Sequence, residues 1–160
     1  ILHVGTAGNK NFQRVIEALR DVPCHLRIIG TLDESTQREL RHRAMDYSVA
    51  ANLSDEALRQ EYVRCQVVSF PSLYEGFGMP IIEAQATGRV VVTSNRLPMC
   101  DVAGAGAVLV DPESVESIRE GFVEALQNGE QYVKAGLQNV RRFMLPDIVE
   151  QYRSLYFEMK

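Results

Sequence analysis

The sequence predicts an α/β fold with a Rossmann-like, doubly wound parallel sheet. Short apolar runs of strand length alternate along the chain with stretches in which apolar residues recur at helical spacing. Two of these runs, VVSF at 67–70 and VVVTS at 90–94, are mostly apolar, which is typical of parallel strands covered by helices on both faces. A chain of 160 residues can bury one hydrophobic core, so we expect a single domain over residues 1–160.

The first half of the chain predicts strands at residues 1–4, 24–30, 47–51 and 67–70. Between them, a helix begins near Phe12, where apolar residues follow at helical spacing. Asp33 can cap a second helix that runs to about Met45, and Ser54 can cap a third. The second half predicts strands at 90–94 and 107–110.

The helices of the second half are marked mainly by proline and glycine. Pro80 is pre-organised for the first position of a helix, and Gly88 suits its end. Asp111 and the proline after it open a further helix, and two more are expected beyond it, separated at Pro146.

The composition argues against a nucleic-acid partner. Apolar residues make up 46% of the chain and charged residues 24%, as in ordinary globular domains, and the net charge is −4. One basic cluster lies on a predicted helix together with Glu34 and Glu39, so we interpret it as a solvated helix face; its members are Arg38, Arg41, His42 and Arg43.

The sequence also indicates a compartment. No apolar run approaches the ~20 residues that a transmembrane helix needs, and no signal peptide is visible. Cys24, Cys65 and Cys100 are widely spaced and form no CxxC pair, so we expect neither a disulfide framework nor a zinc site. Both features predict a reducing, cytoplasmic location.

The stretch PSLYEGFGMPIIEAQATG, residues 71–88, is the first candidate for a binding site. It connects a predicted strand to a predicted helix, and ligands of such folds bind outside the carboxyl ends of the strands. Gly76 and Gly78 let the backbone turn tightly and approach a ligand. The free amides at the start of the following helix, from Met79 onward, would suit a phosphate group.

Two carboxylates, Glu75 and Glu83, flank this loop. A carboxylate only accepts hydrogen bonds, so the pair suits a ligand rich in hydroxyl groups, such as a ribose and a hexose. A purely structural interpretation stays open, in which Glu83 complements the helix N-terminus, worth ~0.3–1 kcal/mol, and Glu75 is solvated.

A second candidate loop, GTAGNKN at residues 5–11, is predicted at the same edge of the sheet. Lys10 falls near a helix N-terminus, where a cation is mildly unfavourable, and a bound anion would remove that conflict. The alternative is an exposed lysine that tolerates the small penalty. The loop matches neither the Walker pattern nor GxGxxG.

The residues of the first loop carry a family resemblance. FPSLYEGFGMPIIEAQATGRVVVTSN, residues 70–95, resembles the donor-site signature of retaining glycosyltransferases of family 4, and Glu75 and Glu83 match that family's pair of glutamates. The likeness extends to VGTAGNKNFQRVIEAL at 4–19 and LPMCDVAGAGAVLVDPES at 97–114, so it covers nearly the whole chain. It implies the C-terminal, donor-binding half of an enzyme of GT-B fold.

The resemblance implies a role for each matching residue. Glu83 would accept the ribose hydroxyls of a nucleotide-sugar, Glu75 would contact the donor sugar, and Lys10 would neutralise the diphosphate leaving group. Glu75 and Lys10 are therefore the expected catalytic residues. The remaining expected contacts to the nucleotide-sugar are Gly5, Thr6, Gly30, Asn52, Leu53, Gly76, Phe77, Gly78 and Met79.

The chain departs from the family pattern at several positions. Many members have an arginine where this chain has Thr6, which removes half of the usual cationic clamp on the diphosphate. Arg96 could replace it, or could be an ordinary loop arginine. Asp101 stands in place of a glutamate and Gln85 in place of a methionine, and neither change removes the donor site.

The resemblance implies that the full-length protein is a retaining glycosyltransferase of polysaccharide biosynthesis. It would move a hexose from a nucleotide-diphosphate sugar to a glycan or lipid-linked acceptor. The similarity of residues 93–112 to mannosyltransferase-like members favours mannose. No cofactor and no metal are expected, since His3, His25 and His42 are scattered along the chain.

The chain begins at Ile1 without an initiator methionine, so we expect a piece of a longer protein. A missing N-terminal domain would bind the acceptor and provide any peripheral contact with the inner membrane face, and the piece alone would be inactive. A terminal helix over residues 145–160 is expected to cross to that domain. Its apolar stripe is expected to pack partly on this domain's own sheet and to leave a part open to self-association; the stripe comprises Ile148, Tyr152, Leu155 and Met159, with Val149 and Tyr156 adjoining.

Three alternatives remain at this stage. A non-hydrolysing sugar-nucleotide epimerase would share the GT-B architecture but should show further catalytic carboxylates and histidines. A non-catalytic nucleotide-binding module of doubly wound fold would show no preference for a sugar on the diphosphate. An interaction domain in which EGFG is only a turn would bind no nucleotide.

Overall fold

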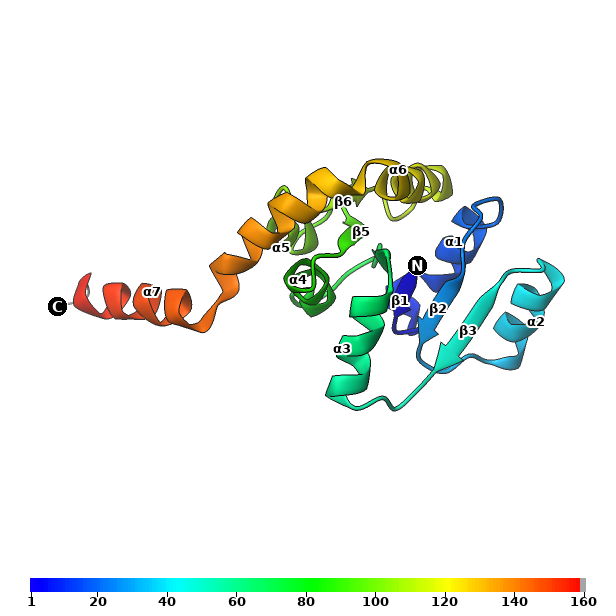
Figure 1. Ribbon diagram of the computed structural model, residues 1–160, viewed down its shortest axis with the longest axis horizontal. Coiled ribbons are helices and arrows are strands. Elements are labelled where there is room, and N and C mark those ends of the chain that lie inside the picture. Colours follow the sequence, from blue (N-terminus) through cyan, green and yellow to red (C-terminus); the bar gives the residue numbers. More distant parts are fainter. Residues whose placement is uncertain (159–160) are drawn as a thin grey trace.

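The computed structural model describes residues 1–158, which form a six-stranded parallel sheet with helices on both faces (Figure 1). The strands lie in the order β3-β2-β1-β4-β5-β6. Their bounds are Leu2–Val4 for β1, Leu26–Ile29 for β2, Tyr47–Ala50 for β3, Val67–Phe70 for β4, Val90–Ser94 for β5 and Val108–Val110 for β6. The predicted doubly wound α/β fold is confirmed.

The centre of the sheet is the pairing of β1 with both β2 and β4. Leu2 lies opposite Arg27 of β2 on one side and opposite Val68 of β4 on the other. The order of the strands therefore reverses between β1 and β4. In folds of this kind, such a reversal opens a crevice at the carboxyl ends of the two strands, because the connections leave toward opposite faces.

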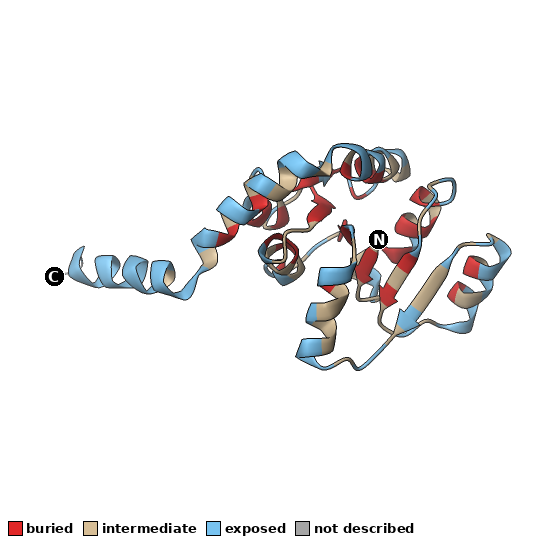
Figure 2. Ribbon diagram, viewed as in Figure 1, coloured by how far each residue is buried: buried red, intermediate tan, exposed pale blue. Residues whose placement is uncertain are grey.

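Three helices cover each face. The helices α1 (Phe12–Ala18), α2 (Glu34–His42) and α6 (Val115–Asn139) pack on one face, where their apolar residues join Ile28 and Val92 in a single core. The helices α3 (Asp55–Arg64), α4 (Met79–Ala86) and α5 (Met99–Ala103) pack on the other, around Val68 and Val91. Figure 2 shows the buried residues concentrated on the strands and on the inner sides of these helices.

Two predicted helix caps form as expected. The carboxylate of Asp33 accepts a hydrogen bond from the amide of Thr36 at 2.7 Å, and the hydroxyl of Ser54 accepts one from Ala57 at 3.3 Å. The helix after Asp33 ends at His42 rather than near Met45. Each cap satisfies an amide at the helix start that has no partner within the helix.

Other boundaries in the second half were predicted wrongly. The helix α4 begins at Met79, one residue before Pro80. Ser114, and not Asp111, caps α6, because its hydroxyl accepts from the amide of Ser117 at 3.1 Å. Two short elements were not predicted at all: α5 and the 3-10 turn η1, which spans Gly8–Lys10.

The last two helices expected from the sequence are divided differently in the structure. The helix α6 continues to Asn139 across a single non-helical residue, Asn128, so the first of the two is part of α6. A 3-10 turn, η2 at Val140–Phe143, then leads into α7 at Leu145–Glu158. Pro146 therefore lies in the first turn of α7, where its missing amide costs nothing, and the terminal helix begins at residue 145 as predicted.

The terminal helix α7 projects from the rest of the molecule (Figure 1). None of its residues is buried, and apolar side chains such as Tyr152 and Leu155 are exposed. The expectation that part of its stripe packs on this domain's sheet is wrong, because the six earlier helices already cover both faces. Met159, the last member of the predicted stripe, lies outside the described residues. Over residues 1–158, no helix combines the length and the apolar character that crossing a bilayer requires.

Gln85, which departs from the family pattern, is a buried polar link between α4 and its neighbours. Its amide donates to the carbonyl of Ala103 at 2.8 Å and accepts from the amide of Asn139 at 2.8 Å. Space for this link comes from Gly106 and Gly136, whose backbones are so close that a Cβ on Gly106 would lie 2.4 Å from the Cα of Gly136. Hydrogen bonds here replace the packing of an apolar side chain.

His3 is fully enclosed in the middle of β1. Its Nδ1 lies 3.0 Å from the hydroxyl of Ser69, and its ring packs against Phe12 with centroids 4.8 Å apart. Burial lowers the pKa of His3 to about 3, so the ring is neutral in the folded protein at neutral pH. The interpretation of this histidine as structural agrees with its position.

This burial predicts a pH dependence of stability. Between about pH 6.5 and 3, the unfolded chain binds one more proton at His3 than the folded chain, so folding loses ~1.4 kcal/mol for each pH unit of acidification. The variant His3→Gln has no group that binds this proton at position 3. Its free energy of unfolding should therefore fall less steeply between pH 6.5 and 5. Urea melts at several pH values measure the slope, and equal slopes for both proteins would contradict the assignment.

Candidate functional site

The candidate site lies where the chain leaves β1 and β4, at the reversal of strand order. The loop after β1 contains Lys10 and leads to α1 on one face. The loop after β4 contains Glu75 and leads to α4 on the other face. Both predicted loops are therefore adjacent, as the parallel arrangement of the strands requires.

Two asparagines that the sequence analysis did not select join these loops. Asn11 is 4% exposed, and its side-chain amide donates to the carbonyls of Pro71, at 2.9 Å, and Pro112, at 2.7 Å. Asn9 accepts the amide of Leu73 on its backbone carbonyl at 2.8 Å and donates through its side chain to Glu75 at 3.2 Å. The only sequence signal for these roles is their place in GTAGNKN, because asparagine also occurs in loops for many other reasons.

Lys10 and Glu75, the two expected catalytic residues, form an ion pair. The Nζ atom of Lys10 lies 2.8 Å from Oε1 of Glu75 and 4.8 Å from the centre of the Phe70 ring. The two charged side chains are only 22% and 13% exposed. Gly5 makes room for the lysine, since a Cβ there would meet Cε of Lys10 at 3.1 Å and the backbone has a φ of +87°.

The second predicted carboxylate, Glu83, lies on α4 and has a partner on α3. The hydroxyl of Tyr62 donates to Oε2 of Glu83 at 2.6 Å, a distance typical of a hydrogen bond to a charged carboxylate. Tyr62 is 2% exposed, and burial together with this bond raises its pKa. Tyr62 was not selected from the sequence, although a buried tyrosine hydroxyl needs a hydrogen-bond partner.

The amino end of α4 has the open backbone that the sequence predicts. Gly78 precedes the helix with a φ of +118°, a conformation that suits glycine, and an added Cβ at Gly76 would meet nothing within 4 Å. Phe77 and Met79 are exposed next to them. The ring of Phe77 packs edge-on against Phe143 of η2, with centroids 5.8 Å apart, so this loop touches the segment that leads into α7.

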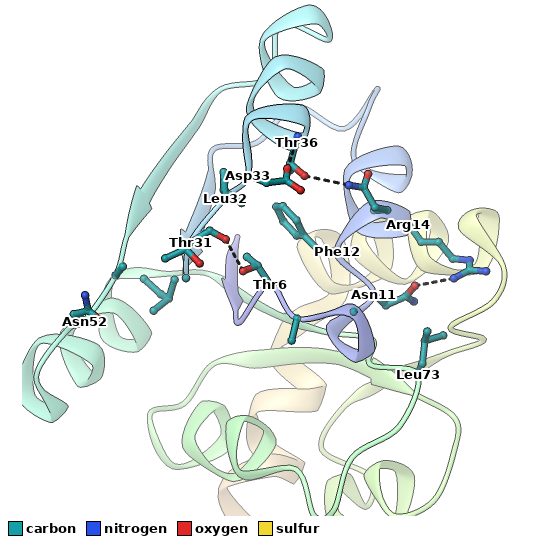
Figure 3. Close-up of a pocket in the computed structure, with 16 residues that line it drawn as sticks. Thr6, Asn11, Phe12, Arg14, Thr31, Leu32, Asp33, Thr36, Asn52 and Leu73 are labelled. Atoms are coloured by element: carbon teal, nitrogen blue, oxygen red, sulfur yellow. Dashed lines mark hydrogen bonds between the residues drawn. The ribbon is translucent and has the colours of Figure 1, made fainter.

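A hollow of about 770 Å³ opens at the carboxyl ends of β1, β2 and β3 (Figure 3). Three predicted contact residues line it: Thr6, Gly30 and Asn52. The hydroxyl of Thr6 donates to the carbonyl of Thr31 at 2.7 Å, and the aromatic ring of Phe12 forms part of the wall. The other predicted residues do not line the hollow, so the structure does not bring all of them together in one pocket; they are Gly5, Lys10, Leu53, Glu75, Gly76, Phe77, Gly78, Met79 and Glu83.

The cation that could replace the missing arginine is otherwise engaged. Arg96 lies 2.6 Å from Glu113 in an exposed ion pair, apart from the Lys10–Glu75 pair. Arg14 lines the hollow, but its guanidinium donates to the side chain of Asn11 at 3.0 Å. Over residues 1–158, no group of three or more histidine, cysteine, aspartate or glutamate side chains is arranged to hold a metal ion.

The fold and the geometry of the site indicate a class of ligand-binding domain. A doubly wound sheet with a lysine, a carboxylate and an open helix N-terminus at its reversal point is typical of α/β domains that bind ligands carrying phosphate. The profile of the family "Glycosyl transferases group 1" matches residues 1–141. The chain belongs to this family of glycosyltransferases.

Curated relatives show the same relationship at low identity. O-antigen chain mannosyltransferase B of Escherichia coli is 27% identical over 97% of the chain, and MMP alpha-(1->4)-mannosyltransferase of Mycolicibacterium hassiacum is 32% identical over 58%. The chain covers 45% of the first relative and 23% of the second. It thus spans less than half the length of these proteins.

Solved structures share the fold. Sucrose-phosphate synthase from Thermosynechococcus elongatus superposes with a TM-score of 0.82 at 20% identity, over 99% of this chain and 45% of that one. Anabaena HepE, solved in complex with UDP and glucose, superposes with a TM-score of 0.81 at 16% identity, over 98% and 48%. The match confirms the Rossmann-like half of a GT-B glycosyltransferase as the fold.

The link between the two loops predicts a stability effect. Asn11→Ala should lower the free energy of unfolding by about 2–4 kcal/mol, because two buried carbonyls lose their donor and alanine tolerates the φ of +61° poorly. Chemical denaturation measures the loss. Asn11→Gly is the matched control: it accepts the backbone conformation, lacks the amide and should lose less. An alanine variant as stable as the native chain would show that the link is not needed.

Proposed function

We propose that the chain is the donor-binding domain of a retaining glycosyltransferase of family 4, and that it binds a nucleotide-diphosphate sugar. The observation that carries the proposal is the meeting of Lys10, Glu75 and the amino end of α4 at the reversal of strand order. A cation and free amides attract a diphosphate, and a carboxylate accepts hydrogen bonds from sugar hydroxyls.

Lys10 would act on the leaving group. Transfer of the sugar breaks the bond between its anomeric carbon and the diphosphate oxygen, so negative charge grows on the diphosphate. Lys10, held over Gly5, and the amides that begin with Met79 would stabilise that charge. The diphosphate would replace Glu75 as the partner of Lys10 and leave Glu75 free to accept from the donor sugar.

Glu83 would accept the ribose hydroxyls, since only one of its oxygens is engaged by Tyr62. The backbone from Gly76 to Met79 would hold sugar and diphosphate, with Phe77 and Gly78 between them. Gly30, Asn52 and Leu53 remain the proposed contacts of the base, and Thr6 with Gly5 those of the first loop. The hollow beside Thr6, Gly30 and Asn52 provides the space for a ligand there.

For the full-length protein, we propose hexose transfer with retention of configuration to a glycan or lipid-linked acceptor, in polysaccharide biosynthesis. Mannose is the favoured sugar, because two of the relatives are described as mannosyltransferases. The acceptor would bind to an N-terminal domain to which α7 would cross, and residues 1–160 without that domain would be inactive. A cytoplasmic location, with peripheral membrane contact through that domain, is part of the same proposal.

Calorimetry with UDP, GDP, ADP and their sugar conjugates tests the proposal. One nucleotide should bind in preference, and its sugar conjugate should bind at least as well. Glu83→Gln should weaken that binding about tenfold, because the neutral amide has one accepting oxygen instead of two and forms weaker hydrogen bonds than a charged carboxylate. Glu120→Gln, which removes an exposed carboxylate of α6, is the matched control and should leave binding unchanged.

The panel also separates the alternatives. Preference for a base without any influence of the sugar would favour a nucleotide-binding module over a donor site. Failure of every ligand to bind the folded chain at millimolar concentration would overturn the proposed function for this chain.

A further inference from the structure

Among residues 1–158, Tyr62 is the one buried side chain that donates a hydrogen bond to a proposed ligand-binding carboxylate. Its ring is enclosed with Leu2, Val68 and Phe70 in the core of one face of the sheet. Its hydroxyl reaches Oε2 of Glu83 at 2.6 Å. Because the core fixes the ring, the position of the hydroxyl is fixed as well.

The hydrogen bond from Tyr62 occupies one accepting position of the Glu83 carboxylate. Tyr62 is the only hydrogen-bond partner of the Glu83 carboxylate among residues 1–158. A carboxylate has about four positions that accept a hydrogen bond, and one of them is filled. A hydrogen bond from a fixed hydroxyl restricts the rotation of the carboxylate, and it leaves Oε1 and a further position on Oε2 without a partner among residues 1–158.

Two adjacent hydroxyl groups match that pair of acceptors. A ribose carries a 2′- and a 3′-hydroxyl on neighbouring carbons, so one carboxylate can accept from both when its plane is held. A 2′-deoxyribose provides only one of the two donors. A glutamate side chain without this hydrogen bond would rotate freely. It would lose that rotational freedom on binding, at a cost in free energy, and would discriminate less between the two sugars.

We infer that Tyr62 is a positioning residue that orients the Glu83 carboxylate toward a vicinal diol and so selects ribonucleoside over 2′-deoxyribonucleoside diphosphates. This inference rests on the proposed function, because it assumes that Glu83 faces the nucleotide. The helix that carries Tyr62 starts directly after Asn52 and Leu53, the proposed contacts of the base. One rigid element thereby joins base recognition to ribose recognition.

Binding of ribo- and deoxyribonucleotides to matched variants tests this inference. The ligands are the nucleoside diphosphate that the native chain prefers and its 2′-deoxy analogue, measured by calorimetry. We expect the native chain to favour the ribonucleotide about tenfold, as for a hydrogen bond to a charged group. Tyr62→Phe should weaken the ribonucleotide roughly five- to tenfold and the deoxy analogue less than about twofold.

A second variant distinguishes an orienting role from a structural one. If Tyr62 acts through Glu83, adding Tyr62→Phe to Glu83→Gln should cause no further loss of ribonucleotide affinity. Tyr132→Phe is the matched control, since it removes another tyrosine–glutamate hydrogen bond, 3.1 Å to Glu124, within α6. It should leave both ligands unaffected.

The possible failures are separable. Equal binding of both nucleotides by the native chain would overturn the inference even if Tyr62→Phe does not fold. Equal losses for the two ligands in Tyr62→Phe, or no loss at all, would overturn it while leaving the proposed function in place. Unchanged ribonucleotide binding by Glu83→Gln would instead contradict the proposed role of Glu83 and, with it, the inference.

Discussion

The side-by-side pairing of β1 and β4 is the contact on which the candidate site depends. These strands are separated in sequence by two other strands, β2 and β3, and their connections run to opposite faces of the sheet. The loop with Lys10 and the loop with Glu75 therefore meet at the one edge where both begin. This pairing brings together Lys10 and Glu75, which are 65 positions apart in the sequence, so that Nζ and Oε1 lie 2.8 Å from each other.

Neutral asparagine side chains connect the two loops, whereas the charged Lys10 and Glu75 pair with each other. Asn9 and Asn11 connect them by donating hydrogen bonds to the backbone carbonyls of Tyr74 and Pro71. Lys10 and Glu75 satisfy each other at low exposure, which avoids leaving either charge unpaired in a partly buried position. In the proposed function, a diphosphate would replace Glu75 as the partner of Lys10, and a sugar would replace Lys10 as the partner of Glu75.

Periodicity and turn chemistry predicted the six strands, most helices and both loops, because these are local properties of the chain. The positions of Asn11 and Tyr62 could not be predicted, since each acts through residues distant in sequence that only the folded sheet brings near. The exposure of α7 was predicted only in part, because some of its stripe was expected to pack on the sheet. An apolar stripe indicates that one face of a helix is stabilised by burial. It does not indicate whether the surface that buries it belongs to the same domain.

The most direct test of the donor-edge site is an amide chemical-shift map of the chain titrated with its preferred nucleotide-sugar. The account predicts that the largest changes fall on residues 5–10 and 76–83, with further changes near Gly30 and Asn52. Residues 125–134, at the opposite ends of the strands, should remain unchanged. Changes concentrated in that second region, with none near Lys10 or Gly78, would contradict the account.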